Sequence, residues 1–230
     1  MSQLLSIIVP VYNEAGTVQQ VIDRLLQIPL PLPREIIVVN DGSTDGTKQV
    51  LNAVPKVEGV LSIVHAAANG GKGSAIRIGL SHARGTIIAI QDADLELDPV
   101  QLADLVQPIL NGEAEVVYGS RFLNGRPPGP WLSVAANRTL TGLTNVLFGS
   151  RLTDMETCYK IMQAPVARGL DLESNRFDIE PEITAKLLRQ GCRILELPVT
   201  FDPRNRASGK KIGWRDGVHA VAVLIKYRFR

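Results

Sequence analysis

Residues 87–94 read Ile87-Ile-Ala-Ile-Gln-Asp-Ala-Asp94, and this stretch decides the fold. Its first four residues are apolar and mostly β-branched, which predicts a buried strand over Thr86–Gln91. Two aspartates, separated by one residue, follow directly where this strand ends. In open α/β sheets ligands bind just beyond the carboxyl ends of the strands, so the pair marks a candidate site.

Segments of strand and helix type alternate on both sides of this stretch. The predicted strands are Leu5–Val11, Glu35–Asp41, Val60–His65, Thr86–Gln91, Glu115–Ser120 and Arg193–Thr200. The predicted helices are Thr17–Gln27, Thr47–Val54, Gly73–His82, Asp98–Leu110, one after Pro130, Glu180–Arg189 and Asp216–Tyr227. This alternation predicts an α/β fold with a mostly parallel sheet and helices on both faces. We find no repeat and no domain boundary, so we expect a single domain over residues 1–230.

The composition indicates a globular protein of the reducing cytoplasm. Apolar residues make up 45% and charged residues 21% of the 230 residues, which excludes a disordered chain. Two cysteines exclude a disulfide scaffold, and the three histidines lack the spacing of a zinc site. No apolar run approaches the ~20 residues of a membrane span, and no signal peptide is evident. We therefore expect a cytoplasmic protein with at most peripheral contact to the cytoplasmic membrane face.

The net charge of +2 conceals a basic C-terminal segment. Residues 204–230 contain eight Lys or Arg residues and one acidic residue, whereas residues 1–203 carry a net charge of −5. This asymmetry indicates an anionic partner, such as a phosphate, an anionic membrane surface or a nucleic acid. A solvated basic face is the alternative.

Polar clusters follow three of the predicted strands. Asp92 and Asp94 can converge on a divalent cation, which in turn neutralises a diphosphate; the alternative role of Asp94 is loop capping. Tyr12 follows the first strand and offers an aromatic face for a base or a sugar. Asp41 follows the second strand and can accept hydrogen bonds from a nucleobase or a ribose. Because parallel strands end at one edge of the sheet, we expect these side chains to lie together.

The glycine-rich segment Asn69–Ser74 does not match the known phosphate loops. The P-loop pattern needs glycine where this chain has Ala66, and it needs Ser or Thr where Gly73 follows the lysine. The dinucleotide pattern fails because Ile76 replaces its third glycine. Nucleotide hydrolysis and nicotinamide binding both lose support, while Lys72 remains well placed to contact an anion.

Taken together, these segments resemble the family 2 inverting glycosyltransferases. The resemblance is closest to the branch of dolichyl-phosphate mannose synthases and bacterial polyprenyl-phosphate glycosyltransferases, and it covers nearly the whole chain. The matching segments are Ile8–Glu14, Val38–Asp45, Asn69–Gly73, Asp92–Asp94, Gly119–Phe122, Asp154–Lys160, Arg176–Glu182, Glu196–Val199 and Gly209–Gly213.

The resemblance implies a GT-A fold, a Rossmann-like α/β/α sandwich, with a nucleotide-sugar donor and Mg²⁺ or Mn²⁺. Residues 1–122 would bind a donor of the GDP-mannose or UDP-glucose type, and residues 123–230 would form the acceptor side. The implied donor-binding residues are Pro10, Tyr12, Glu14, Val39, Asp41, Lys72, Asp92, Ala93, Asp94 and Arg121. The implied metal ligands are Asp92, Asp94 and Glu96, although Glu96 stands where the mannose synthases tend to have Gln.

The implied reaction is inverting transfer of the sugar to a polyprenyl or dolichyl phosphate at the membrane surface, with no nucleic acid as partner. The implied catalytic residues are Asp94, Arg121, Asp154, Arg204 and Lys211, with Arg206 or Lys210 as substitutes in the basic loop.

Two alternative activities remain open at this stage. A hydroxyl acceptor would need a general base, for which the candidates are Asp154 and Glu156. The structural alternative for Asp154 is a salt bridge with Arg151 or Lys160. A sugar-phosphate nucleotidylyltransferase, the other alternative activity, usually has a glycine-rich loop with arginine after its first strand, where this chain has Tyr12-Asn-Glu14.

Overall fold

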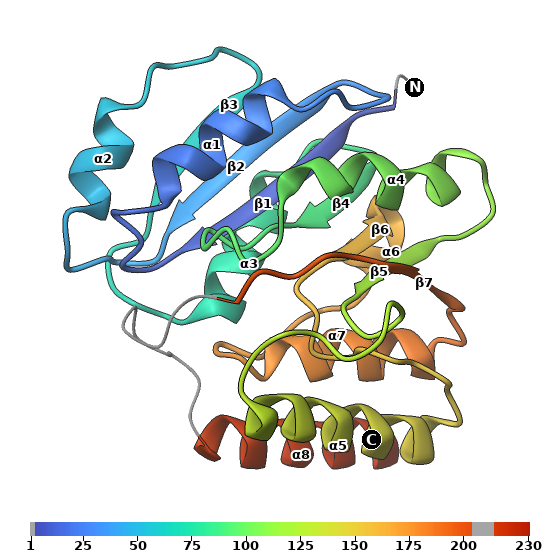
Figure 1. Cartoon of the computed structure of the whole chain (residues 1–230). Coiled ribbons are helices and arrows are strands. Elements are labelled where there is room, and N and C mark those ends of the chain that lie inside the picture. The colour runs from blue at the N-terminus through green and yellow to red at the C-terminus, as the bar shows by residue number, and fades with distance from the viewer. Residues whose placement is uncertain (1–2, 204–213) are drawn as a thin grey trace.

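The structure is a computed structural model that describes residues 3–203 and 214–230. The strands of these residues form one seven-stranded sheet in the order β3-β2-β1-β4-β6-β5-β7 (Figure 1). The strands are β1 Leu5–Val11, β2 Arg34–Asn40, β3 Leu61–His65, β4 Ile87–Ile90, β5 Val116–Ser120, β6 Lys160–Gln163 and β7 Ile194–Pro198.

Four of the strands form a parallel half of the sheet, in the order β3-β2-β1-β4. Val11, at the end of β1, pairs with Asn40 at the end of β2, while Ile8 pairs with Ile90 at the end of β4. The segments that follow β1, β2 and β4 therefore leave the sheet at the same edge. This is the edge at which the sequence predicted a site.

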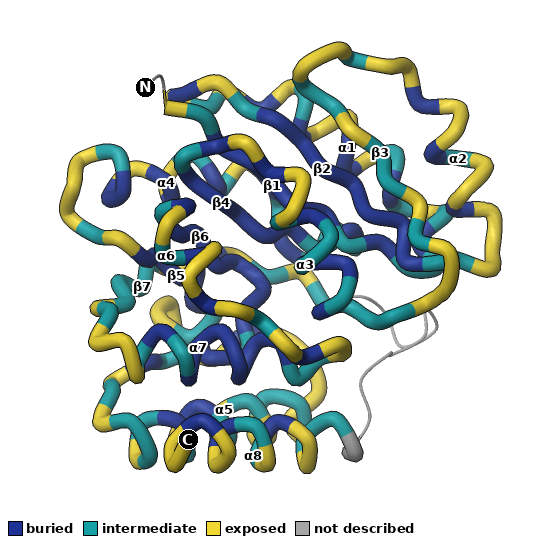
Figure 2. The backbone as a smooth tube through the Cα atoms, turned by 180° about the vertical axis from the view of Figure 1, so that it is seen from behind, coloured by how far each residue is buried: buried dark blue, intermediate teal, exposed yellow. Residues whose placement is uncertain are grey.

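Helices cover both faces of the sheet, which confirms the predicted α/β sandwich. They are α1 Val18–Gln27, α2 Thr47–Ala53, α3 Lys72–His82, the 3₁₀ helix η1 Pro99–Gln101, α4 Leu102–Leu110, α5 Trp131–Phe148, α6 Ala164–Arg168, α7 Ile179–Arg189 and α8 Trp214–Phe229. Because successive strand residues point to opposite faces, Ile7 and Val9 of β1 pack with α1 and α4, whereas Ile8 packs with α3 and α7. Figure 2 shows β1, β2 and β4 as a continuous buried band.

Two helices form a further layer beyond α7. Leu224 and Tyr227 of α8 pack with Met155 and with Leu140 and Leu143 of α5 in a third hydrophobic cluster. Figures 1 and 2 both show α5 and α8 side by side, with α7 between them and the sheet. No helix in the described ranges is long and apolar enough to cross a membrane.

The sequence analysis missed one strand and one short helix. β6 runs antiparallel to both of its neighbours, β4 and β5, and α6 follows it directly. Its four residues begin with Lys160, whose side chain is fully buried. The ammonium donates hydrogen bonds to the carbonyls of Met155 and Thr157 and lies 4.6 Å from the centre of the Tyr118 ring. Buried carbonyls therefore solvate a charge that the sequence pattern assigns to the surface.

Candidate active site

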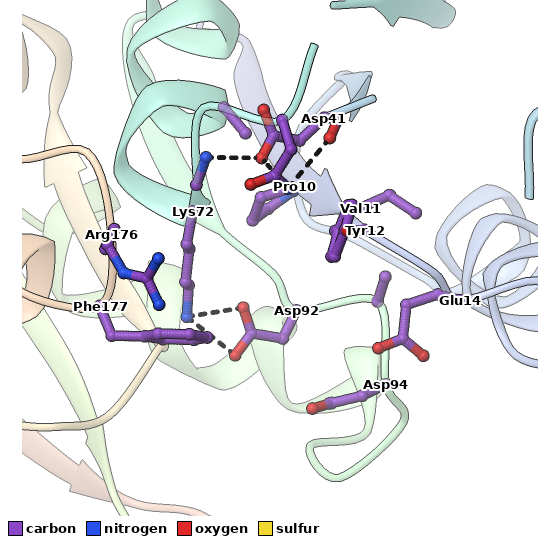
Figure 3. A pocket seen from close by; sticks show the side chains of 14 residues that line it. Pro10, Val11, Tyr12, Glu14, Asp41, Lys72, Asp92, Asp94, Arg176 and Phe177 are labelled. Carbon is purple, nitrogen blue, oxygen red and sulfur yellow. Dashed lines mark hydrogen bonds and ion pairs between the residues drawn. The ribbon is translucent and has the colours of Figure 1, made fainter. Parts of the chain in front are cut away.

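A cavity of about 410 Å³ lies at the edge where β1, β2 and β4 end (Figure 3). Most of the residues predicted for donor binding line it, as does the pair Asp92 and Asp94. Its lining residues are Pro10, Val11, Tyr12, Glu14, Asp41, Asn69, Gly71, Lys72, Ala75, Asp92, Ala93, Asp94, Arg176 and Phe177. The predicted convergence of the strand ends is therefore present in the structure.

The segment after β1 is tied to the segments that follow β2 and β4. The backbone N–H of Glu14 donates to the Thr47 hydroxyl at 2.8 Å. The hydroxyl of Thr17 lies 3.0 Å from Oε2 of Glu14 and 2.7 Å from the carbonyl oxygen of Ala93. These bonds fix the wall that carries Tyr12 and Glu14 relative to the aspartates.

Asp41 organises the glycine-rich turn from within the fold. Its carboxylate accepts the backbone N–H groups of Gly70 at 2.9 Å and Gly71 at 2.7 Å, and the side-chain amide of Asn69 at 3.0 Å. Gly71 has a φ of +92°, and a Cβ there would collide with the carbonyl oxygen of Asn175. The glycines therefore serve a close backbone approach between the turn and the loop before α7.

This close approach brings two further side chains into the cavity. The sequence analysis gave neither of them an individual role. Arg176 and Phe177 follow the contact directly and line the cavity opposite the strand ends (Figure 3). Both lie in a segment that contributed to the family resemblance, Arg176–Glu182. The resemblance of that segment was the sequence feature that could have identified Arg176 and Phe177 as site residues.

Lys72 contacts anions, but they are carboxylates of the protein itself. Its Nζ lies 2.8 Å from Oδ1 of Asp92 and 2.7 Å from Oε1 of Glu180. Burial disfavours the ammonium, yet the two carboxylates outweigh burial and raise the pKa of Lys72 above its usual value. Burial likewise acts to raise the pKa of Asp92, and the Lys72 charge outweighs it and lowers that pKa. Lys72 is therefore part of a buried ion-paired cluster at the cavity wall.

The carboxylates of the cavity fit a divalent ion that is shared with a ligand. Asp92 and Asp94 both line the cavity, and the Lys72 ammonium shows that a cation is accommodated beside Asp92. Within the described parts of the chain no group of three or more His, Cys, Asp or Glu residues is arranged to hold a metal ion. Mg²⁺ is commonly held by one or two carboxylates together with substrate phosphates and water. The donor set suits that arrangement.

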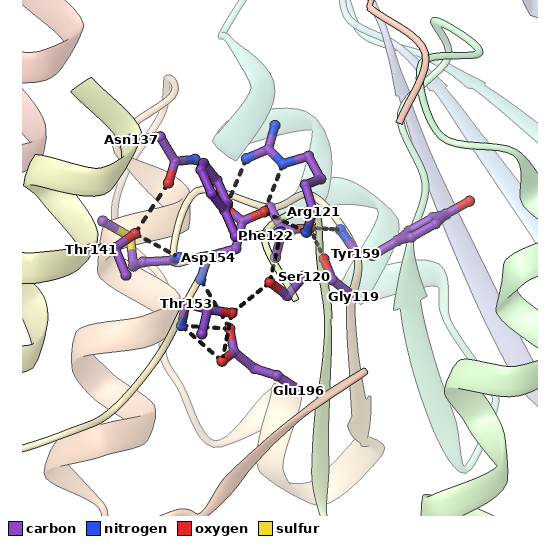
Figure 4. Close-up of polar contacts among 12 residues, drawn as sticks. Gly119, Ser120, Arg121, Phe122, Asn137, Thr141, Thr153, Asp154, Tyr159 and Glu196 are labelled. Carbon is purple, nitrogen blue, oxygen red and sulfur yellow. Dashed lines mark hydrogen bonds and ion pairs between the residues drawn. The ribbon is translucent and has the colours of Figure 1, made fainter. Parts of the chain in front are cut away.

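Asp154 and Arg121 form a second ion pair, which does not line the cavity (Figure 4). Nε of Arg121 lies 2.7 Å from Oδ2 of Asp154, Nη2 lies 2.8 Å from Oδ1, and the Arg121 N–H donates to Oδ2 at 3.0 Å. Asn137 donates a further bond to Oδ1 at 2.9 Å. Burial acts to raise the pKa of Asp154, and the bonds and charge of Arg121 outweigh it and lower that pKa. A salt bridge of Asp154 is present, but the expected partners, Arg151 and Lys160, were wrong.

Glu156 lies beside this pair and is partly exposed as a residue. Oε1 of Glu156 is buried and has no hydrogen-bond partner among the described residues. Burial and the nearby charge of Glu180 raise the pKa of Glu156 to about 7. Burial also lowers the pKa of Lys160 to about 8. Glu156 is absent from the cavity lining.

Several predicted site residues do not line the cavity. Val39 is fully buried in the cluster between the sheet and α3, because its position in β2 points its side chain toward the α3 face of the sheet. Glu96 is not part of the lining, and its backbone N–H donates to Oδ1 of Asp94 at 3.2 Å. Arg204 and Lys211, with Arg206 and Lys210, lie outside the described residues.

Curated relatives match most of this chain at moderate identity. Glycosyltransferase AglD from Haloferax volcanii is 28% identical over 207 residues, which cover 87% of this chain and 33% of that protein. Dodecaprenyl-phosphate galacturonate synthase from Rhizobium johnstonii is 30% identical over 211 residues, covering 90% of this chain and 61% of the relative. Undecaprenyl-phosphate mannosyltransferase from Micrococcus luteus is 28% identical over 227 residues, covering 94% of this chain and 90% of the relative. The chain thus spans between a third and nine tenths of these proteins.

A solved structure shares the fold. Glucosyl-3-phosphoglycerate synthase from Mycobacterium tuberculosis, crystallised with UDP, superposes with a TM-score of 0.77 over 99% of this chain and 80% of that chain, at 19% identity. The model of glycosyl transferase family 2 matches residues 6–169. The chain has the GT-A fold and belongs to glycosyl transferase family 2.

Proposed function

We propose that the protein transfers a sugar, with inversion, from a nucleotide-sugar donor to a polyprenyl phosphate. The names of two relatives described above include a polyprenyl-phosphate acceptor, which supports this acceptor class. The cavity of about 410 Å³ falls within the range of ordinary small-molecule sites. The observation that carries the proposal is the pair Asp92 and Asp94 in this cavity at the carboxyl edge of the sheet.

The cavity offers each part of the donor a matching side chain. Tyr12 and Phe177 present aromatic faces for the base, and Arg176 brings a positive charge for the diphosphate. Asp92 and Asp94 would hold Mg²⁺ or Mn²⁺, which when bound neutralises the charge that grows on the leaving diphosphate. The glucosyl-3-phosphoglycerate synthase described above was also crystallised with Mn²⁺, UDP and glucosyl-3-phosphoglycerate together, which supports this assignment.

The state of Asp154 favours a phosphate acceptor over a hydroxyl acceptor. A hydroxyl needs a base to remove its proton, whereas a phosphate monoester is already anionic near pH 7. Asp154 is fully buried, and Arg121 and Asn137 occupy both of its oxygens. Glu156, the other base candidate, is partly exposed and is not among the residues that line the cavity. Neither residue is among those that line the cavity, which supports an acceptor that is already anionic.

The outer surface of α5 and α8 supports contact with a membrane. Leu132 and Val146 of α5 are 61% and 83% exposed, and Val218, Ile225 and Phe229 of α8 are 57%, 47% and 78% exposed. The three α8 residues recur at helical spacing and so share one side of the helix. Adjacent helices that each expose large apolar side chains form an apolar patch of the kind that marks an interaction site. A lipid-linked acceptor makes a membrane the fitting partner for this α5–α8 surface.

A transfer assay with paired acceptors tests the proposal. Purified protein receives radiolabelled GDP-mannose or UDP-glucose with Mn²⁺ and either undecaprenyl phosphate in micelles or a soluble sugar acceptor. We expect label in the lipid fraction only, and we expect a chelator to abolish it. Transfer only to the soluble sugar would contradict the acceptor class. Transfer that is unchanged by the chelator would contradict the metal assignment.

A further inference from the structure

We propose that Lys72 is a tethered cation that exchanges between Asp92 and Glu180, and that Glu180 is thereby a positioning residue for metal binding at Asp92. The inference rests on the proposed function only in taking Asp92 as a metal ligand. In the metal-free protein the ammonium contacts both Asp92 and Glu180. When a divalent ion binds Asp92, the ammonium moves fully onto Glu180.

The geometry shows one ammonium shared by two carboxylates from different elements. Lys72 lies at the start of α3, Asp92 follows β4, and Glu180 lies in the first turn of α7. The distances from Nζ to the nearest oxygen of each carboxylate are nearly equal, at 2.8 Å and 2.7 Å. Figure 3 shows the Lys72 side chain extended along the cavity toward Asp92. The ammonium therefore sits between the two carboxylates, with both oxygens of Asp92 and one oxygen of Glu180 within 3.0 Å.

Glu180 has spare capacity to accept the displaced ammonium. Its Oε2 is buried and has no hydrogen-bond partner among the described residues, while its Oε1 already contacts Nζ of Lys72. A buried carboxylate oxygen without a partner is costly, so a position that satisfies it is favoured. A small movement of Nζ toward Oε2 gives up its contacts with Oδ1 of Asp92 at 2.8 Å and Oδ2 at 3.0 Å, keeps the contact with Oε1 of Glu180 and adds one with Oε2. Lysine suits this exchange because its ammonium is a point charge with rotatable donors on a flexible stem.

The surroundings restrict the ammonium to these two partners. The side chain of Lys72 is 12% exposed and that of Glu180 is 7% exposed, whereas Asp92, at 27%, is open to the cavity. The glycine contacts between the turn at residues 70–73 and residues 174–175 hold α3 against the start of α7. A divalent ion at Asp92 would repel the adjacent ammonium. Movement of the ammonium onto Glu180 relieves that repulsion and keeps the positive charge at the cavity wall.

The exchange predicts that substitutions of Lys72 and of Glu180 change the Mn²⁺ affinity in opposite directions. Lys72→Met removes the competitor for Asp92, so the protein should bind Mn²⁺ about tenfold more tightly. Glu180→Gln removes the alternative partner and leaves the ammonium on Asp92, so Mn²⁺ binding should weaken about tenfold. If Lys72 instead supported the metal site or served only the fold, Lys72→Met would weaken binding, and that result would overturn the proposal.

The experiment is a double-mutant cycle on Mn²⁺ affinity without nucleotide, read from the free-ion signal in electron paramagnetic resonance. Because Glu180 acts through Lys72, Glu180→Gln should change the affinity less than twofold in the Lys72→Met background. Equal effects of Glu180→Gln in both backgrounds would indicate through-space electrostatics and would overturn the exchange. Melting temperatures of all variants verify folding.

A matched control separates the local contact from charge removal on the same helix. Glu182 is also buried on α7 but pairs with Lys186 at 2.6 Å, so Glu182→Gln should leave the Mn²⁺ affinity within twofold of the unmodified chain. A Glu182→Gln effect as large as that of Glu180→Gln would contradict the proposal. Absence of Mn²⁺ binding by the unmodified chain would overturn the metal assignment itself, whereas additive effects on measurable binding would overturn only the exchange.

Discussion

Asp92, which follows β4, and Asp154, in the loop before β6, are each paired with a cation in a different way. Asp92 opens to the cavity and shares a single ammonium with Glu180. Asp154 is fully buried and receives two side-chain bonds from the Arg121 guanidinium, one from the Arg121 backbone and one from Asn137. The planar guanidinium matches both carboxylate oxygens at once, whereas an ammonium can move between acceptors.

The comparison indicates that burial and the geometry of the partner decide whether a paired aspartate is available to a new ligand or supports the fold. Asp154 has no room for a new partner without loss of several bonds. Asp92 can exchange its single ammonium for another cation at low cost. Substitutions at the two sites should therefore affect different measurements, and the following tests run from the largest expected effect to the smallest.

Asp154→Asn should destabilise the protein by about 3–5 kcal/mol, because it leaves the Arg121 charge largely buried without its counter-ion. Urea unfolding measures this change. Arg24→Ala is the control, since it removes an exposed ion pair with Asp98 and should cost less than about 1 kcal/mol. Equal costs for both variants would show that Asp154 is no more structural than a surface residue.

Asp94→Asn should lower turnover about 100-fold or more while the melting temperature stays within about 2 °C, because a lost metal ligand costs up to several kcal/mol in the transition state. The measurement is the transfer assay at saturating Mn²⁺, with Asp104→Asn on α4 as the exposed control. Unchanged turnover would remove Asp94 from the site. A large loss of thermal stability would instead assign Asp94 to its contact with the Glu96 backbone.

Glu156→Gln should stabilise the protein at pH 8 by on the order of 1–3 kcal/mol and have little effect at pH 5. Since the folded-state pKa is about 7 against an ordinary 4.5, the folded protein binds more protons than the unfolded chain between these values. The free energy of unfolding therefore falls as pH rises through this window, and glutamine abolishes the fall.

Urea unfolding at both pH values measures the effect of Glu156→Gln. Glu58→Gln at an exposed position is the control. A stabilisation by Glu156→Gln that is the same at pH 5 and pH 8 would contradict the assignment of the titrating group.

The part of the cavity that the strand ends form was predictable because its signals are local. β1, β2 and β4 are apolar runs that end in polar clusters, and parallel strands bring those clusters to one edge. The side chain of Val39 does not line the cavity, because strand alternation turns it into the core on the α3 face, and the resemblance carries no information on that orientation. The helix predicted from Asp98 begins there, as η1, and the Asp98 side chain caps its first turn, since Asp-Pro is a local helix-start signal.

The ion-pair partners could not be predicted, because they depend on contacts across the fold. Sequence proximity suggested Arg151 or Lys160 for Asp154, yet Arg121 reaches it from the end of β5. The sequence analysis assigned no strand to residues 160–163, because a four-residue segment that begins with a charged residue does not show the apolar pattern of a strand. The burial of Lys160 depends on carbonyls that only the folded turn before β6 presents.

The antiparallel strand β6 has a consequence for the order in which the chain assembles. The hydrogen-bonded neighbours of β5 among the described strands are β6 and β7, and both are synthesised after it. During synthesis, β1 to β4 can pair early, whereas β5 and the free edge of β4 remain open until residue 163 has emerged. Open strand edges are templates for association between chains, and the long connection through α5 slows their closure. We therefore expect the chain to be open to association in the interval between the synthesis of β5 and that of β6, and a chaperone that binds residues 116–120 would act there.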